Sequence, residues 1–383
     1  MTSLYADSFS IYMNSLKNTW IAFLCCCLFF PLNGMAQILG SAPNDLPRFR
    51  PLHYICYKSK APLKIDGKLD ESSWQEAQFS QKFLDIEGTK KPQPLQETRV
   101  KMLWDDNYLY FAAELKETDL WATIEKRDSV IFYDNDFEIF IDPDGDTHNY
   151  YEFEVNAFGT EWDLLLPKPY RDGGPAIDGW DIAGMKVGIQ LNGSLNDNSD
   201  RDSSWVLEIA MPWNILEECA PEGKPPFHKD QWRINFSRVE YFLDKEGKTY
   251  KKRINPETGK SFPEFNWVWS PQGKINMHMP EMWGFVQFSR EKVGEGFDEF
   301  QWNRDEDIKW ALRQVYYKQK AFKEATQNYS RSLDQLGLGN MMLNGKKLTP
   351  YIEATSASFV ASLGSSDGNG IWYIREDGKT WKK

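Results

Sequence analysis

Residues 98–113, with the sequence TRVKMLWDDNYLYFAA, decide the fold class of this chain. Residues 98–104 and 108–113 are rich in β-branched and aromatic side chains, which favour strands. They flank Asp105-Asp106-Asn107, whose residue types tolerate the backbone angles of a tight turn. The stretch therefore predicts a β-hairpin.

Strand patterns recur on both sides of this hairpin. Residues 185–191 and 205–211 alternate large apolar side chains with smaller or polar ones, and a period of two indicates a strand with one buried face. Further β-rich runs occupy residues 63–65, 137–141, 151–155, 232–239, 267–270 and 283–288. About ten strands with long loops predict a mainly β chain, arranged as a two-sheet β-sandwich of the jelly-roll kind.

The pattern changes after residue 296, where apolar side chains recur at steps of three and four. This spacing predicts an amphipathic helix, with Asn303 or Asp305 as its N-cap and Gly337 as its end. We expect its apolar face to pack on the sandwich, and short strands to follow at residues 351–360 and 371–374. The side chains of the face are Ile308, Leu312, Val315, Gln319, Phe322, Tyr329, Leu333 and Leu336.

The N-terminal region has the pattern of a secretory signal peptide. Residues 20–32 (WIAFLCCCLFFPL) are apolar, follow Lys17 and precede the small-x-small motif Gly34-Met35-Ala36. The run is shorter than the about 20 apolar residues of a membrane-spanning helix. We therefore expect a secreted or periplasmic protein without a membrane span, cleaved near Ala36 and Gln37.

These patterns divide the chain into four parts. We expect a signal peptide over residues 1–36, a linker over 37–61, the sandwich over 62–289, and a C-terminal helix and strand extension over 290–383. After removal of the leader, Cys56 and Cys219 are the remaining cysteines. They can form one disulfide or stay as two buried thiols, and the sequence leaves both alternatives open.

Charge and aromatic content narrow the class of partner. The formal net charge of −11 argues against nucleic acid, because phosphate binding needs clustered Lys and Arg. The chain has 16 Trp, 17 Tyr and 24 Phe. Because aromatic side chains bury large apolar areas, many of them should form the core. Some of the rings could form flat platforms for a ligand.

Several motifs, in order, resemble family 9 carbohydrate-binding modules over residues 62–289. They are residues 65–71 (IDGKLDE) with Trp74 and Ala77, 103–110 (LWDDNYLY), 136–143 (DFEIFIDP), 153–156 (FEVN) with Gly159, 208–213 (EIAMPW), 269–270 (WS) and 280–285 (PEMWGF). The resemblance implies a β-sandwich with bound calcium, and a site in which two Trp rings hold the end of a sugar chain. It also implies a secreted protein of glycan-degrading bacteria.

The chain departs from the family at the positions that hold the sugar. Phe132 or Tyr133 stands where the family has one Trp ring, Met277 where it has the other, and Glu154 where it has an Arg. The carboxylate of Glu138 is kept. The ligand therefore cannot be carried over unchanged from the family.

A second candidate site is the Pro- and Gly-rich loop of residues 166–180 (LPKPYRDGGPAIDGW). Sugars stack their C–H faces on aromatic rings and bond their hydroxyls to charged or amide groups. We therefore predict a glycan-binding site formed by Glu138 with Tyr170, Arg171 and Trp180 of this loop. The alternative is an ordinary surface loop whose aromatic rings fix it to the core.

Residues 142–146 (DPDGD) resemble the start of a calcium-binding loop, with oxygen ligands at alternate positions. The rest of such a loop is missing, since Thr147 replaces the usual Gly and Phe153 the usual Glu. A polar turn is the alternative. The family resemblance is compatible with a structural calcium ion held by Asp142, Asp144 and Asp146.

The function predicted from these features is glycan binding without catalysis, in glycan recognition or degradation. One alternative is a glycoside hydrolase that uses Asp136 and Glu138 as its carboxylate pair. Another is a structural or assembly protein of the cell envelope whose sandwich and C-terminal helix dock on a partner. Besides a glycan or polysaccharide, the partners that we expect are other glycan-degrading envelope proteins. The sequence has neither a Gly-x-Ser-x-Gly elbow nor a His-Glu-x-x-His motif, so no second motif supports catalysis.

Overall fold

The computed structural model describes residues 44–45, 49–343 and 345–383. The predicted signal peptide, its cleavage site and the first part of the predicted linker lie outside these residues.

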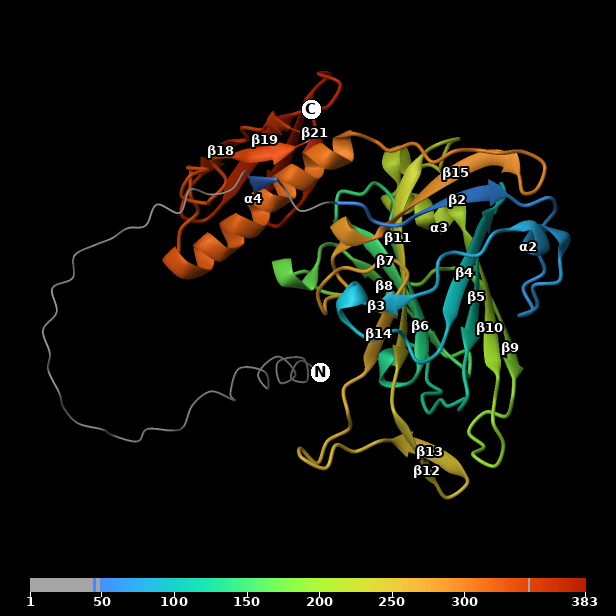
Figure 1. Cartoon of the computed structure of the whole chain (residues 1–383). Helices are drawn as coiled ribbons and strands as arrows, with labels where there is room; N and C mark the ends of the chain where they lie inside the picture. The colour runs from blue at the N-terminus through green and yellow to red at the C-terminus, as the bar shows by residue number, and fades with distance from the viewer. Residues whose placement is uncertain (1–43, 46–48, 344) are drawn as a thin grey trace, which may run out of the picture. The chain divides into compact units, whose positions relative to one another are not determined.

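A large curled sheet is the main element of the fold (Figure 1). Among the described residues it joins twelve strands. Ten follow one another in the order β8 (Glu161–Leu166), β7 (Tyr150–Asn156), β6 (Asp136–Asp142), β11 (Gln231–Glu240), β15 (Gly284–Lys292), β2 (His53–Lys58), β4 (Thr98–Trp104), β5 (Tyr108–Lys116), β10 (Ser204–Pro212) and β9 (Lys186–Asn192). β14 (Phe265–Val268) pairs with β11, and β3 (Leu84–Asp85) pairs with β14.

The predicted hairpin is present as the antiparallel pair β4 and β5, and the prediction of a mainly β chain is confirmed. The two-sheet sandwich is not confirmed, because β2 connects what we expected to be two sheets. It pairs in parallel with β15 along residues 53–56 and then with β4 at Tyr57 and Lys58. The hydrogen bonds therefore form one continuous sheet around a shared core.

This core takes large side chains from both halves of the curled sheet. Met102 and Phe111 come from β4 and β5, and Phe137, Tyr151 and Phe236 come from β6, β7 and β11. The rings of Phe137 and Phe236 stack 5.9 Å apart. Burial of such rings is the main source of stability in a domain of this kind.

Glu208 connects the 208–213 motif to the 65–71 motif and its Trp74 through hydrogen bonds. Its Oε2 accepts hydrogen bonds from the backbone N–H groups of Asp66 (2.9 Å) and Gly67 (2.7 Å), and its Oε1 accepts one from Trp74 Nε1 (2.7 Å). Gly67 has φ +82°, and a Cβ there would lie 2.4 Å from the backbone nitrogen of Gln190. The 65–71 motif therefore requires glycine at its turn and the carboxylate of the 208–213 motif beside it.

The C-terminal region combines the helix α4 (Asp305–Thr326) with a four-stranded sheet. Its strands are β18 (Tyr351–Ala354), β19 (Phe359–Gly364), β20 (Ile371–Arg375) and β21 (Thr380–Lys382). Leu312 and Val315 of α4 pack against Phe359 and Ile374 of this sheet. The apolar face thus packs mainly on the C-terminal sheet, whereas we expected it to pack on the sandwich.

The helix is also shorter than its sequence pattern indicated. It ends at Thr326 rather than at Gly337, and the next residue, Gln327, has a left-handed φ of 63°. Tyr329, Leu333 and Leu336 still contact the same core, but from a segment after the helix. At the start of the helix, the Asn303 side chain accepts a hydrogen bond from the backbone N–H of Asp305 (3.0 Å).

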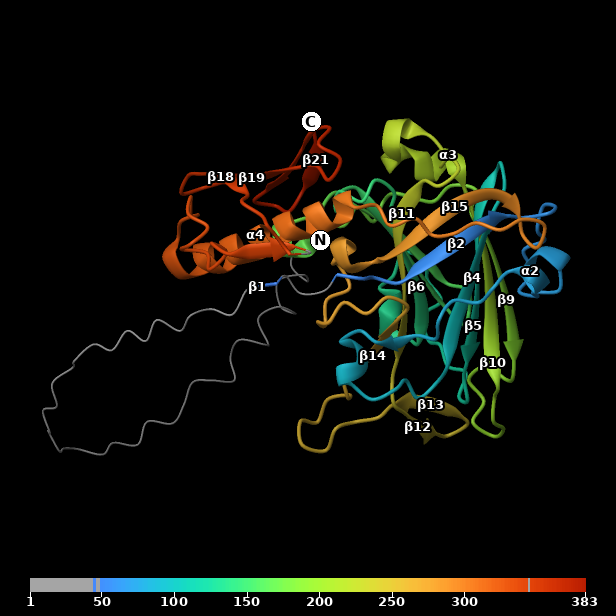
Figure 2. The same ribbon diagram turned by 45° about the horizontal axis from the view of Figure 1, so that its top comes forward.

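The remaining elements are short (Figure 2). They are the strands β1 (Asn44–Asp45), β12 (Leu243–Glu246), β13 (Thr249–Lys252), β16 (Met341–Leu343) and β17 (Lys346–Lys347), the helices α2 (Ser72–Glu76) and α3 (Trp213–Leu216), and the 3₁₀ helices η1 (Gly88–Lys90), η2 (Ile131–Tyr133), η3 (Tyr170–Asp172), η4 (Glu217–Cys219), η5 (Pro221–Gly223) and η6 (Pro280–Met282).

Cys56 and Cys219 are both free thiols, so the structure has two unpaired cysteines rather than a disulfide.

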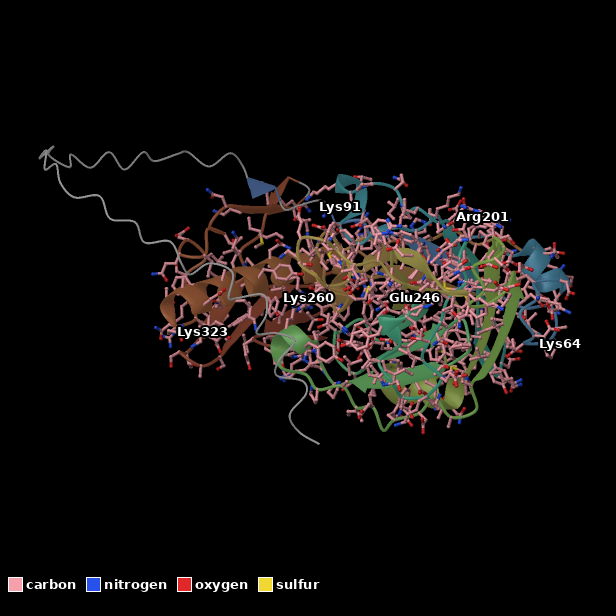
Figure 3. All side chains as sticks on the ribbon, turned by 90° about the horizontal axis from the view of Figure 1, so that it is seen from below. Lys64, Lys91, Arg201, Glu246, Lys260 and Lys323 are labelled. Carbon is pink, nitrogen blue, oxygen red and sulfur yellow. The ribbon has the colours of Figure 1, made fainter. Side chains whose placement is uncertain are left out.

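Of the helices in the described residues, none combines the length and the hydrophobicity needed to cross a bilayer. Figure 3 shows the labelled basic side chains Lys64, Arg201 and Lys323 on widely separated parts of the surface.

Candidate functional site

A pocket of about 180 Å³ opens beside strands β6 and β7. Its walls combine aromatic rings and carboxylates with four other side chains, those of Leu164, Val239, Asn266 and Met277. The rings are those of Phe132, Phe140, Trp162, Tyr170 and His278. The carboxylates are those of Glu138, Glu152, Glu154 and Glu264.

The pairing of β6 with β7 places most of these carboxylates side by side. Glu138 lies directly opposite Glu154, and Asp136 lies opposite Asn156. Because side chains alternate between the two faces of a strand, Asp136 shares a face with Glu138, and Glu152 shares one with Glu154. Like charges directly opposite each other destabilise a sheet. The facing pair of Glu138 and Glu154 therefore lowers the stability of the sheet when both carboxylates are charged.

These carboxyl groups are also buried. Asp136, Glu138, Glu152 and Glu154 have exposed fractions of 0%, 5%, 4% and 1%. Burial raises the pKa of all four, and repulsion among them adds to the effect for Asp136, Glu152 and Glu154. The pKa of Glu138 is raised to about 7, mainly by burial and further by Glu264.

The protein satisfies these groups only in part. Glu154 Oε2 accepts a hydrogen bond from the backbone N–H of Phe132 (3.0 Å), and Asp136 Oδ1 accepts one from Val239 N–H (3.3 Å). Asp136 Oδ2 and Glu152 Oε2 are buried without a hydrogen-bond partner in the described chain. A buried polar atom without a partner is costly in a native protein, so these two oxygens require a proton, a water, an ion or a ligand.

His278 does not supply positive charge to the pocket. Its Nε2 lies 3.9 Å from Glu152, and its Nδ1 is 2.9 Å from the hydroxyl of Tyr150. Burial, together with the nearby charge of Arg171, lowers the pKa of His278 to about 3. The imidazole is therefore neutral at physiological pH, and it serves as an aromatic and hydrogen-bonding wall.

Two of the four residues predicted to bind a ligand reach this pocket. Glu138 forms part of its floor, and Tyr170, 43% exposed, packs its ring edge-on against His278 with centroids 4.4 Å apart. Trp180 lies elsewhere, since it stacks on Tyr151 (centroids 5.0 Å apart) and donates a hydrogen bond to Glu218 (3.2 Å). The ligand-binding role of these residues stays a prediction.

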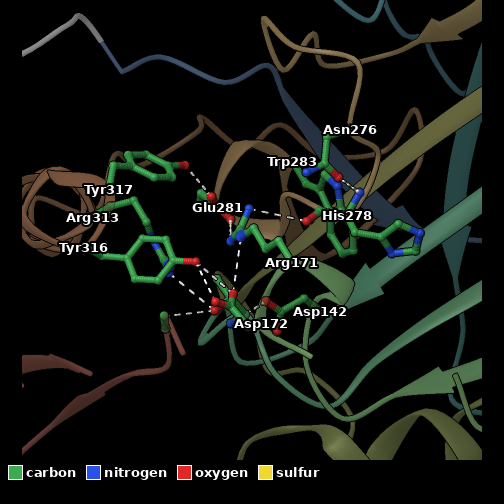
Figure 4. A network of polar contacts seen from close by, with 12 residues as sticks. Asp142, Arg171, Asp172, Asn276, His278, Glu281, Trp283, Arg313, Tyr316 and Tyr317 are labelled. Carbon is green, nitrogen blue, oxygen red and sulfur yellow. Dashed lines mark hydrogen bonds and ion pairs between the residues drawn. The ribbon is translucent and has the colours of Figure 1, made fainter. Parts of the chain in front are cut away.

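Arg171 does not line the pocket, and its guanidinium joins a polar network that also involves α4 (Figure 4). Its guanidinium pairs with Glu281 (2.9 Å) and with Asp172 (3.3 Å). Tyr316 of α4 donates to Asp172 (2.8 Å), and Tyr317 of α4 donates to Glu281. The structure therefore does not bring Arg171 and Trp180 together with Glu138 and Tyr170.

Sequence reasoning missed several residues of the pocket. Glu152, Trp162, Glu264 and His278 line it, and so does Met277, which the sequence marked only as a departure from the family. The period of two in residues 150–156 could have placed Glu152 beside Glu154. The approach of Glu264 and His278 depends on loop conformations that have no local sequence signal.

The carboxylates of the predicted calcium loop at residues 142–146 already have partners within the protein. Asp142 accepts hydrogen bonds from the backbone N–H groups of Gly145 (3.0 Å) and Thr147 (2.9 Å). Asp146 pairs with Lys379 (2.9 Å). Asp142, Asp144 and Asp146 offer carboxylate oxygens within 4.8 Å of one another, but backbone donors and a lysine already use several of them. Calcium binding by these three residues stays a prediction.

Residues 65–226 match the family model described as carbohydrate family 9 binding domain-like. The resemblance inferred from the sequence motifs is therefore confirmed for this part of the chain. The matched region contains Glu138, Glu152, Glu154 and Tyr170, while Glu264 and His278 lie beyond it.

Curated relatives and solved structures are similar to parts of this chain. It is 27% identical over 153 residues (40% of this chain) to endo-1,4-beta-xylanase A of Thermoanaerobacterium saccharolyticum, and 27% identical over 117 residues (30%) to exoglucanase XynX of Acetivibrio thermocellus. It spans only 11% and 9% of those relatives. A family 9 carbohydrate-binding module from Caldicellulosiruptor kristjanssonii in complex with cellotriose is 15% identical, with a TM-score of 0.36 over 64% of this chain and 99% of that one.

Proposed function

We propose that this protein, with its carbohydrate family 9 binding domain-like region at residues 65–226, is an exported glycan-binding protein whose ligand occupies the pocket beside β6 and β7. The observation that carries the proposal is the composition of this pocket, where aromatic rings face a group of carboxylates. Rings stack on the C–H faces of sugars, and carboxylates accept hydrogen bonds from their hydroxyls. A sugar ring needs both kinds of surface.

Tyr170 and Glu138 carry this proposal, because both line the pocket. Tyr170 is partly exposed and offers an aromatic ring, while Glu138 is buried and offers a carboxylate. The apolar rings of Phe132 and Trp162 complete the walls. An end or a side branch of a glycan fits a cavity of about 180 Å³ better than a long internal stretch of chain does.

A glycan array with the purified protein tests this function. Wild type should retain a defined group of glycans, and Tyr170→Ala should weaken retention at least fivefold. Trp180→Ala is the matched control, since its ring stacks on Tyr151 away from the pocket, and it should bind nearly as wild type does. Equal binding by wild type and Tyr170→Ala would place the ligand elsewhere.

Export rests on the signal-peptide pattern of residues 1–36. Mass spectrometry of the exported protein should show an N-terminus near Gln37. An intact leader in the membrane fraction would contradict this part of the proposal.

The proposal also assigns the protein to glycan recognition or degradation together with other envelope proteins. Co-purification of such envelope proteins with this protein on labelled glycans tests this assignment.

Hydrolysis is the second candidate, because paired carboxylates are the machinery of glycosidases. Glu138 and Glu154 lie opposite each other, and Asp136 is beside them. Incubation of the retained glycans with wild type and Glu138→Gln distinguishes the two functions. Binding without release of reducing ends supports a binding protein, whereas release that depends on Glu138 supports a hydrolase.

A further inference from the structure

Three clusters of acidic side chains occur in the described residues, and they differ in how their charge is balanced. In the cluster of Asp128, Asp163 and Asp181, the guanidinium of Arg127 lies 2.6 Å from Asp163 and 2.9 Å from Asp181. In the 142–146 loop, Lys379 pairs with Asp146. Each of these two clusters has a cation supplied by the protein.

The third cluster consists of Asp136, Glu138 and Glu154, and we call it the pocket cluster. Glu138 and Glu154 line the pocket, and Asp136 is fully buried two residues before Glu138 on β6. Each residue offers an oxygen atom, and these atoms lie within 4.8 Å of one another. All three residues are buried. Within residues 49–343 and 345–383, no Lys or Arg forms an ion pair with any of them.

A second observation, independent of the clustering, concerns Glu152. This side chain lines the same pocket and is 4% exposed, yet its Oε2 has no hydrogen-bond partner in the described chain. Asp136 Oδ2 is buried without a partner as well. Bare buried charges are strongly unfavourable, so these groups need protons or a cation.

We propose that Asp136, Glu138 and Glu154 bind a divalent cation such as Ca²⁺ at the floor of the pocket, with Glu152 beside it. Ca²⁺ binds oxygen ligands at about 2.3–2.6 Å, so oxygens on opposite sides of the ion are about 5 Å apart. The spacing within the pocket cluster fits this limit. The near-complete burial of the three residues favours a bare ion over an ammonium group that carries a sugar ring.

The ion also gives the pocket a way to hold its glycan, a step that rests on the proposed function. Ca²⁺ takes six to eight oxygen ligands, and three carboxylates leave positions open on the side of the pocket. Hydroxyl groups of a sugar can fill those positions. Glu154, which reverses the charge of the family's Arg, would thus replace a cationic side chain by a site for a metal cation.

Calorimetric titration of CaCl2 into the chelator-stripped full chain tests the cation site. Glu154→Gln should remove one binding event or weaken it at least tenfold, while Asp144→Asn in the 142–146 loop should keep that event. If Glu154→Gln does not fold, as judged by circular dichroism, Glu138→Gln replaces it with the same expectation. Absence of Ca²⁺ binding, or equal binding by wild type and the pocket variant, would overturn the proposal. So would a titration in which glucosamine oligomers bind the pocket and Ca²⁺ does not.

Glycan retention with and without chelator then tests the coupling. Wild type should lose at least tenfold in retention when EDTA is added, and Glu154→Gln should be weak in both conditions. Strong retention that EDTA leaves unchanged would overturn the coupling. Calcium binding without any glycan retention would instead contradict the proposed function and leave the cation site standing.

Discussion

The pocket and the polar network beside the middle of α4 both contain buried carboxylates, and the two regions balance them in opposite ways. In the network, burial alone would raise the pKa of Glu281, but Arg171 and Arg313 outweigh burial and lower it to about 2. In the pocket, burial raises the pKa of Glu138 to about 7, and no arginine opposes it among the described neighbours. The paired charges of the network stabilise the fold. The pocket carboxylates have no cationic partner among the described residues, and they remain available to bind a ligand in the proposed site.

The short helix η3 belongs to both regions. Tyr170 lines the pocket, while Arg171 and Asp172 belong to the network. Figure 4 shows Arg171 between Glu281 and Asp172, with Tyr316 and Tyr317 approaching from α4. The network therefore holds one wall of the pocket against the C-terminal region. Substitutions in these neighbouring residues should have very different consequences for stability.

The largest effect is expected for Arg171→Met. The substitution leaves Glu281 and Asp172 buried without this partner, and breaking a buried ion pair costs about 3–5 kcal/mol. Urea unfolding followed by fluorescence measures the loss. Arg375→Met is the control, because Arg375 is 42% exposed and its pair with Asp377 should contribute less than about 1 kcal/mol. Similar losses for both variants would remove the distinction between the network and an ordinary surface pair.

The acid sensitivity of Glu281 should be nearly as large. Its pKa is about 2 in the folded protein and near 4.5 in the unfolded chain, so its stabilising contribution is complete above pH 4.5 and is lost as the pH falls toward 2. The difference corresponds to about 3 kcal/mol. Urea midpoints measured between pH 5 and pH 3 should fall more steeply for wild type than for Glu281→Gln. Parallel curves for the two proteins would show that Glu281 is not held ionised by its arginines.

A smaller change of opposite sign is expected in the pocket. Glu154→Gln removes one of two like charges that face each other, and its side-chain oxygen can still accept the hydrogen bond from Phe132. In the presence of chelator, the variant should therefore be more stable than wild type by about 0.5–1 kcal/mol. Thermal unfolding with EDTA measures this difference. A less stable variant would mean that the pocket carboxylates are balanced by the protein itself.

The sequence predicted the strands better than the pocket. The hairpin at residues 98–113 and the alternation at 205–211 depend on local side-chain patterns, and both regions form strands. The joining of the sheet by β2 depends on parallel pairing with β15, a strand more than 200 residues away, which has no local signature. Likewise, the pairing of Arg171 with Glu281 joins residues far apart in the chain and has no local sequence signal.

Tyr170→Ala should have the smallest effect on stability, although it changes the residue next to Arg171. The ring of Tyr170 is 43% exposed and packs edge-on against His278, so its removal takes away little buried apolar surface. We expect a change of less than about 1 kcal/mol in the free energy of unfolding. Urea unfolding of Tyr170→Ala and Arg171→Met under the same conditions measures both. A loss for Tyr170→Ala as large as that for Arg171→Met would show that η3 is a single structural unit, and that the pocket cannot change without the network.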